Sequence, residues 1–280
     1  MPKPSSRATA DLLRRWQVPV GGKGFQLPRC DPSAKPLSSG SKADDRDRVS
    51  ALASEIDTLQ DLFFADRRYK LLVLLQGTDT AGKDGTIRAV FKETSPLGVR
   101  SVAWKAPTEQ ERSYDFLWRI HAQVPHTGEI VIHNRSHYED VLVPGVNGWI
   151  DKSVLAQRMA QINDFERLLT ETGTVVMKFM LHISKDEQRQ RLQERLDDPL
   201  KHWKFDVNDL TARAQWSAYQ SAYEQLLRAT STPWAPWTVV PADSKTHRNL
   251  VIATLVRDQL ASLGLRYPAG DPALAKLVIA

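Results

Sequence analysis

The feature that most constrains this chain is an apolar run that passes directly into a glycine-rich loop ending in lysine. Residues 71–75 are all Leu or Val, and residues 77–83 read GTDTAGK, which fits the Walker A pattern Gly-x-x-x-x-Gly-Lys. A short apolar run of this kind is typical of a buried parallel strand. In such a loop the backbone amides surround phosphate oxygens, while the lysine and the N-terminus of the next helix add positive charge. Run and loop together predict an α/β chain that binds phosphate groups.

Short apolar runs continue to alternate with helical periods, and this pattern predicts one domain over residues 46–265. Strands are expected at residues 71–75, 99–104, 129–133, 175–183 and 238–240, and helices from residue 46 and at 85–93, 108–124, 152–169, 184–196, 210–229 and 248–263. Strands separated by helices pair in parallel through right-handed crossovers. We therefore expect a three-layer α/β fold.

The two ends of the chain differ from this pattern. Residues 1–45 include a Pro/Ser/Gly-rich stretch, so we expect an irregular extension that wraps the surface, and residues 266–280 form a C-terminal tail. Residues 1–6 lack the apolar core of a secretory signal. The Arg-rich residues 5–17 contain Asp11 and precede no cleavage pattern, which argues against a transit peptide.

Composition narrows the class of protein but does not identify a partner. With 25% charged and 41% hydrophobic residues, the chain has the balance of a globular protein rather than a disordered or fibrous one. Its longest aliphatic run is far shorter than the roughly 20 residues that span a bilayer. The single cysteine, Cys30, cannot form an internal disulfide, which favours a reducing compartment. We expect a cytoplasmic protein with no membrane or nucleic-acid partner.

The formal net charge of +5 lies entirely in the N-terminal part. Residues 1–50 hold ten basic and five acidic residues, whereas residues 51–280 hold 28 of each. Net charge alone therefore cannot identify a polyanionic partner.

Within the loop, Lys83 and Asp79 are the candidate catalytic residues. The residue after the lysine is Asp84, where the common motif has the Ser or Thr that binds Mg²⁺. Asp79 is the better metal ligand, because a carboxylate inside the loop can hold an ion that bridges phosphates. The alternative is a glycine-rich turn with a solvated lysine, but the agreement of strand, loop and helix favours phosphate binding. The other phosphate-binding candidates are Gly77, Thr80, Ala81, Gly82, Asp84, Gly85 and Thr86.

A second polar segment, residues 133–138, follows the strand predicted at 129–133. In a P-loop fold this place holds a second metal-site residue. Here it is Asn134, which binds metal directly only weakly. Arg135 comes next, and it either reaches phosphate from the carboxyl edge of the sheet or forms an ion pair with Glu139 or Asp140. The residues alone leave both interpretations open.

A third segment, residues 185–213, contains seven basic and seven acidic residues. A salt-bridged surface hairpin is the simpler interpretation. In P-loop kinases, however, a late helical hairpin acts as a lid that brings cations over the transferred phosphate. The Asp-Asp-Pro break at residues 197–199 is consistent with a hinge.

Lys105, Arg112 and Arg119 flank the helix predicted at 108–124, where P-loop kinases often receive the acceptor. Arg112 and Arg119 are seven residues apart, which places them on one face of a helix. Binding of an acceptor phosphate and ordinary surface pairing both remain open. We expect the histidines at 121, 133 and 137, and most tryptophans of the C-terminal half, to serve packing.

Taken together, these segments resemble the polyphosphate kinase 2 family. The stretches that carry the resemblance read, in order, GTDTAGKDGTIR, HNRSHYEDVLV, RLDDPLKHWKF and PWAPWTVVPADSK. The resemblance covers about residues 46–265. It is greatest to the single-domain branch that uses polyphosphate to phosphorylate nucleoside mono- or diphosphates.

The resemblance implies a P-loop kinase fold with a helical lid at about 185–213, a homo-oligomer (dimer or tetramer), and Mg²⁺ or Mn²⁺ as cofactor. It implies inorganic polyphosphate and AMP or ADP as substrates, with GMP and GDP as further acceptors. It assigns catalytic roles to Asp79, Lys83 and Arg135, and it accepts Asp84 after the lysine and Asn at 134. Its lid cations correspond to Arg195, Lys201 and Lys204. Asn134 and Glu139 lie where they would affect the choice of acceptor.

Two rival functions remain. An ATP-dependent P-loop kinase of a nucleoside or small metabolite would share the loop and differ in its donor. A non-catalytic polyanion-binding protein would rely on the basic N-terminal segment, and it would not need the metal-binding carboxylate of Asp79.

Overall fold

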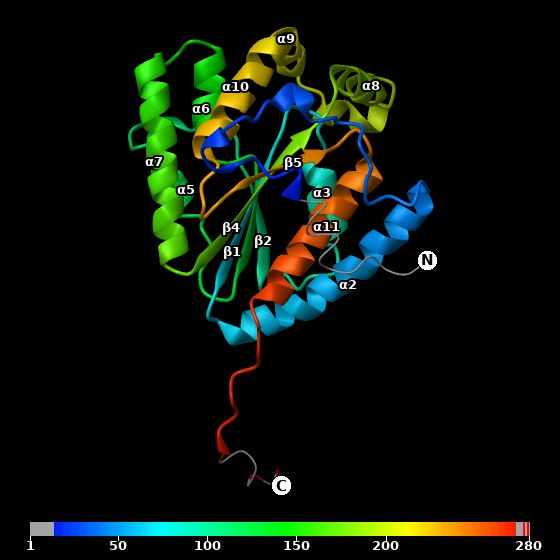
Figure 1. The fold of residues 1–280 in the computed structure, drawn as a ribbon, viewed down its shortest axis with the longest axis vertical. Coiled ribbons are helices and arrows are strands. Elements are labelled where there is room, and N and C mark those ends of the chain that lie inside the picture. The colour runs from blue at the N-terminus through cyan, green and yellow to red at the C-terminus, as the bar shows by residue number, and fades with distance from the viewer. Residues whose placement is uncertain (1–13, 273–276, 278, 280) are drawn as a thin grey trace.

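A five-stranded parallel sheet with the order β2-β3-β1-β4-β5 forms the centre of the molecule (Figure 1). The computed structural model describes residues 14–272 together with residues 277 and 279. The strands are β1 (Lys70–Gln76), β2 (Val99–Ala103), β3 (Ile130–Asn134), β4 (Thr174–His182) and β5 (Trp237–Pro241). Each predicted strand differs from the observed one by no more than one residue at either end.

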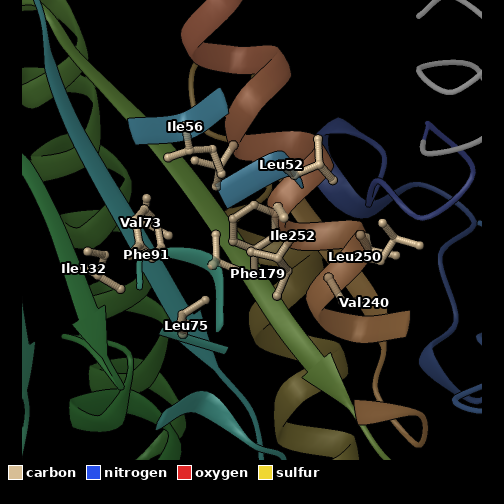
Figure 2. Close-up of a cluster of buried hydrophobic side chains, with 14 of the residues drawn as sticks. Leu52, Ile56, Val73, Leu75, Phe91, Ile132, Phe179, Val240, Leu250 and Ile252 are labelled. Atoms are coloured by element: carbon tan, nitrogen blue, oxygen red, sulfur yellow. The ribbon is translucent and has the colours of Figure 1, made fainter. Parts of the chain in front are cut away.

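One face of the sheet is covered by three helices: α2 (Lys42–Asp66), α3 (Lys83–Val90) and α11 (Lys245–Ser262). Side chains alternate between the two faces of a strand. Val73 and Leu75 of β1 therefore point to this side, where they join a buried cluster with Ile56 of α2 and Ile252 of α11 (Figure 2).

The opposite face carries a second apolar cluster. Leu72 and Leu74 of β1 pack there with residues of the helices α5 (Trp118–His121), α6 (Glu139–Val146), α7 (Lys152–Glu171) and α10 (Trp216–Thr230). The three-layer α/β architecture is thus confirmed. A hairpin formed by α8 (Lys185–Leu196), the 3-10 helix η3 (Pro199–Lys204) and α9 (Asn208–Ala214) lies beyond the carboxyl ends of the strands (Figure 1).

The prediction of one helix over residues 108–124 was wrong. Thr108 does form the expected capping box with Glu111, but α4 (Glu109–Arg112) ends after one turn, before α5. Between them, the Asp115 side chain accepts a hydrogen bond from the backbone N–H of Leu117. Such side chain–backbone bonds compete with helical ones. Arg112 and Arg119 consequently do not share a helical face.

Other helix boundaries also differ from the prediction. The helix predicted at 210–229 is interrupted at Gln215, between α9 and α10. Helix α2 begins at Lys42 rather than at residue 46, because the Ser41 side chain caps it by accepting from the N–H groups of Ala43 and Asp44. Helix α6, which contains Pro144, was not predicted.

The described part of the N-terminal extension contains the short 3-10 helices η1 (Val20–Gly22) and η2 (Leu27–Arg29), and it does more than wrap the surface. Val18 and Leu27 are fully buried in the cluster with α10, and Leu37 is buried on the α2 side. The Ser231 hydroxyl donates to the carbonyl of Val18 over 2.8 Å. Residues 14–41 therefore supply core side chains to the fold.

The expectations for a leader segment fall mostly on residues 1–13, and six of the fifteen residues of the predicted tail are 273–276, 278 and 280. Residues 1–13, 273–276, 278 and 280 lie outside the described residues. In the part of the chain that is described, no helix combines the length and apolarity needed to cross a bilayer.

Candidate phosphoryl-transfer site

The glycine-rich loop turns tightly between β1 and α3. Gly77, Thr80 and Gly82 adopt positive φ values of 149°, 66° and 101°. A Cβ at Gly77 would lie 2.7 Å from the carbonyl oxygen of Leu181, so the close approach to β4 requires glycine there. For Thr80, this conformation costs roughly 1–2 kcal/mol. The hydroxyls of Thr78 and Thr80 are buried and have no hydrogen-bond partner within the described residues, which leaves them available to a ligand.

Lys83 is the first residue of α3, and its side chain reaches back across the loop. Its Nζ donates to the carbonyl oxygens of Gly77 at 2.7 Å and Thr78 at 3.3 Å. Burial, together with the nearby charge of Arg135, lowers the pKa of Lys83 to about 8. The ammonium group is therefore charged at neutral pH and held at the mouth of the loop.

Arg135 links the loop to the segment after β3. Its guanidinium contacts the Asp79 carboxylate at 2.5 Å and the Glu139 carboxylate at 3.1 Å. Burial alone would raise the pKa of Asp79, but the charges of Arg135 and Lys83 hold it below its ordinary value. The carboxylates of Glu139 and Asp79 in turn raise the pKa of Arg135. Arg135 thus lies beside the phosphate loop and also forms the predicted ion pair with Glu139.

The remaining candidates near the loop differ in accessibility. Asp84 is exposed in the first turn of α3 and accepts a hydrogen bond from the Asn134 amide at 2.5 Å. Gly85 is exposed beside it. The Thr86 hydroxyl points instead into the structure, toward the Gly82 carbonyl and the Asn249 side chain. Ala81 is fully buried. Loop and helix thus present Asp84 and Gly85 outward and turn Ala81 and Thr86 inward.

The three lid candidates lie in different surroundings. Arg195 contacts Asp209 at 3.3 Å and is near enough to the loop to lower the pKa of Asp79. Lys201 forms an ion pair with Asp198 at 2.7 Å, and the Nζ of Lys204 lies 4.8 Å from the centre of the Trp203 ring. Of these three cations, Arg195 alone interacts with the loop.

The loop opens into a pocket that combines polar and aromatic walls. Gly77, Thr78, Asp79, Arg135 and Glu139 line one part, and Leu142, Val143, Gln188, Ala212, Trp216, Tyr219 and Tyr223 line the rest. The aromatic residues of α10 were not among the candidates. Their spacing of three and four residues places them on one helical face, and this spacing was the available signal.

Of the residues expected around the acceptor, Glu139 lines this pocket, whereas Lys105, Arg112, Arg119 and Asn134 do not. Arg119 is buried, forms an ion pair with Asp140 at 3.1 Å and donates to the carbonyl of Lys105. Arg112 is exposed and donates to the carbonyl of Pro107. The Lys105 side chain is exposed as well. Arg119 therefore forms a buried ion pair rather than the surface pairing considered as the alternative.

The side chains around the loop are suited to a hard cation that is bound partly by the protein and partly by the substrate. Within the described ranges, no group of three or more His, Cys, Asp or Glu side chains could enclose a metal ion. Mg²⁺ usually binds through one or two carboxylates together with substrate phosphates and water. Asp79, a charged carboxylate inside the loop, meets that requirement.

Comparison with known proteins gives one consistent family. The profile of polyphosphate kinase 2 (PPK2) matches residues 39–264. The AMP/ADP-polyphosphate phosphotransferase of Meiothermus ruber is 46% identical over 267 residues, covering 95% of this chain and 100% of that protein. The ADP-polyphosphate phosphotransferase of Rhodopseudomonas palustris is 39% identical, covering 79% of this chain and 81% of that protein.

A solved structure agrees. The crystal structure of polyphosphate kinase 2 from Arthrobacter aurescens TC1 superposes with a TM-score of 0.89 at 44% identity, covering 96% of this chain and 95% of that one. Since sequence, fold and loop agree over nearly the whole length, this chain belongs to the polyphosphate kinase 2 family.

Proposed function

We propose that this protein transfers phosphoryl groups between inorganic polyphosphate and nucleoside mono- or diphosphates. The observation that carries the proposal is the meeting of Asp79, Lys83 and Arg135 at the mouth of the phosphate loop. Membership of the polyphosphate kinase 2 family supports polyphosphate as the donor. The name of the Meiothermus ruber relative supports AMP and ADP as acceptors.

GMP and GDP are further acceptors to test. A GDP-polyphosphate phosphotransferase of Pseudomonas aeruginosa is 35% identical to this chain over 206 residues. Glu139 and Asn134 lie next to Arg135 and are the residues we propose to affect this choice.

In the proposed reaction the protein acts mainly through position and charge. Lys83 and the loop amides hold the transferred phosphoryl group, while Arg135 offsets the charge that develops on its oxygens. Arg195, brought over the loop by the lid hairpin, adds a further cation, and Lys201 and Lys204 contribute along the polyphosphate chain. Such in-line transfer needs no covalent intermediate with the protein.

We propose that Mg²⁺ or Mn²⁺ binds at Asp79 together with the substrate phosphates. The ion would neutralise phosphate charge and orient the oxygens. To bind the ion, Asp79 would leave its ion pair with Arg135, and the ion pair between Arg135 and Glu139 would remain.

The test is an assay of donor choice. The protein is incubated with long-chain polyphosphate, Mg²⁺ and AMP, ADP, GMP or GDP in separate reactions that contain no ATP. Formation of the next higher nucleotide is expected, and it should be absent with the Lys83→Met variant. If no nucleotide is phosphorylated while ATP with a nucleoside or small metabolite gives product, the protein is an ATP-dependent kinase. Binding of polyphosphate without any turnover would indicate a non-catalytic polyanion-binding protein.

We also propose a cytoplasmic location and a homo-oligomer, a dimer or tetramer. The single cysteine, Cys30, and the nucleotide substrates support the location, and the family resemblance supports the oligomer. Light scattering of the purified protein gives the oligomeric state directly.

A further inference from the structure

Two buried arginines from distant parts of the chain donate hydrogen bonds to backbone carbonyls of the phosphate loop. Arg191 comes from α8 and Arg248 from α11, and their exposed fractions are only 4% and 2%. Both donate hydrogen bonds to the carbonyl oxygen of Ala81, within the loop. Neither side chain lines the pocket described above.

Arg191 connects three segments through one guanidinium group. It donates to the carbonyls of Thr80 at 2.9 Å and Ala81 at 3.1 Å, and to the carbonyls of Ala242 and Asp243 after β5 at 2.7 and 2.9 Å. Its Nε contacts the Glu187 carboxylate at 2.6 Å. The first helix of the lid hairpin is therefore fixed to the loop, and the charge of Arg191 has an acidic partner.

Arg248 differs because its contacts are neutral. Its Nη1 donates to the Ala81 carbonyl at 2.9 Å, and its Nε and Nη2 donate to the Asn249 side-chain oxygen at 3.1 and 2.8 Å. A Cβ at Gly82 would overlap this guanidinium, so glycine at 82 is what allows the arginine to approach. In the described part of the chain, no carboxylate forms an ion pair with Arg248.

These contacts affect how the loop can bind an anion. The peptide group is planar and trans, so its C=O and N–H point in opposite directions. Holding the Ala81 carbonyl toward the two arginines turns the Gly82 N–H away from them, to the side where a phosphate would bind. A buried charge without an acidic partner is also unfavourable, and an anion in the loop would offset that cost.

We propose that Arg248, supported by Arg191, is a positioning residue for the polyphosphate donor. It orients the loop amides and supplies a buried positive charge that is balanced when phosphate binds. The inference rests on the proposed function, because it takes the loop to be the site of the donor phosphate.

The test measures binding of tripolyphosphate by calorimetry, with Mg²⁺ and without an acceptor, so that turnover is not involved. Arg248→Gln removes the charge and should raise the Kd by roughly 10- to 100-fold, the range for loss of a charged hydrogen-bonding group. Arg257→Gln is the matched control. Arg257 also lies on α11, but it pairs with Glu55 at 2.6 Å and does not contact the loop. Its Kd should equal that of the wild type.

A second variant distinguishes the effect of the Arg248 charge on binding from the effect of Arg248 on folding. Asn249→Asp keeps Arg248 in place and gives it a carboxylate partner at an oxygen that already accepts its hydrogen bonds. We expect a melting temperature at or above that of the wild type and a Kd for tripolyphosphate about tenfold higher. A purely structural role for Arg248 predicts greater stability with unchanged binding.

The outcomes are distinct. Weaker binding by Arg248→Gln and Asn249→Asp, with an unchanged control, supports the inference. Wild-type affinity in folded Arg248→Gln or in Asn249→Asp overturns it while leaving the proposed function intact. If the wild-type protein itself does not bind tripolyphosphate, the proposed function fails, and this inference fails with it.

Discussion

The phosphate loop and the lid hairpin both carry cations, but the two regions hold them in different ways. Lys83 is buried against loop carbonyls and Arg135 is fixed between two carboxylates. In the lid, Lys201 pairs with Asp198 of its own turn and has 51% of its side chain exposed, and Trp203 is 79% exposed. The loop cations are thus held in fixed contacts, whereas Lys201 and Trp203 at the tip of the lid lie at the surface. We expect substitutions in the loop to act on the chemical step and substitutions in the lid to act on binding.

Arg135→Gln should have the largest effect. The arginine lies where charge develops on the transferred group, and loss of such an arginine in related chemistry costs roughly 10³–10⁵ in rate. The measurement is kcat with saturating polyphosphate and nucleotide, with the melting temperature as a check on folding. A folded variant within tenfold of the wild type would show that Arg135 serves only to pair with Glu139.

Asp79→Asn tests the metal role in the same region. Removal of the loop carboxylate should lower activity by roughly 10²-fold or more and shift the Mg²⁺ titration to higher concentrations. Asp84→Asn is the control, because Asp84 is exposed and accepts a hydrogen bond from Asn134, and no ion pair links it to Arg135 within the described residues. An unchanged Mg²⁺ midpoint in Asp79→Asn, or an equal shift in the control, would place the ion elsewhere.

The loop could be predicted from the sequence, since strand, turn and helix follow one another within 21 residues and need no distant partner. The position of Arg135 followed from the same logic, because parallel strands end at one edge of the sheet. Of its two carboxylate partners, Glu139 was one of the two considered from the sequence, whereas Asp79 is 56 residues away and was not expected as a partner.

Other parts depended on contacts that no local pattern contains. The predicted helix is interrupted after Arg112, where the Asp115 side chain accepts a hydrogen bond from the backbone N–H of Leu117. Arg112 and Arg119 therefore do not lie on one helical face, as the sequence had suggested. The aromatic wall of the pocket exists only because α10 packs across α6. Arg248 is 167 residues from Ala81, so its contact with the loop could not be found by spacing.

Lys83 gives the loop a pH dependence that Lys201 should not share, because the hydrogen bond to Asp198 raises the pKa of Lys201. Its pKa of about 8 means that the unliganded loop loses this charge as the pH rises through 8. Tripolyphosphate affinity should fall by about tenfold between pH 7 and pH 9, and Lys83→Met should bind weakly at both. Burial makes this pKa lower than in the unfolded chain, so charged Lys83 lowers stability below pH 8, and that cost lessens as the pH rises further. A flat affinity profile in the wild type would contradict the assignment.

Arg195→Gln probes, among the three lid candidates, the one whose charge lowers the pKa of Asp79 in the loop. Its removal should raise the KM for polyphosphate by roughly tenfold and change kcat less than Arg135→Gln does, because its effect depends on how the hairpin is placed. Burial and the charge of Asp79 raise the pKa of its partner Asp209 to about 6. The variant leaves that carboxylate without its cation, so the KM should rise more at pH 7.5 than at pH 5.5. A kcat loss equal to that of Arg135→Gln would show that the lid is already in its working position.

Lys201→Gln should have the smallest effect. Its ion pair with Asp198 is exposed, and exposed pairs contribute little to stability, so the melting temperature should hardly change. The KM for long-chain polyphosphate should rise by about threefold at low salt and less at 0.5 M salt, because exposed charges are screened. Tripolyphosphate is too short to extend far from the loop, and its KM should stay unchanged. If the KM values for long-chain polyphosphate and for tripolyphosphate rise equally, the tip of the lid closes directly over the loop. The contrast between the loop and the lid would then describe only the unliganded state.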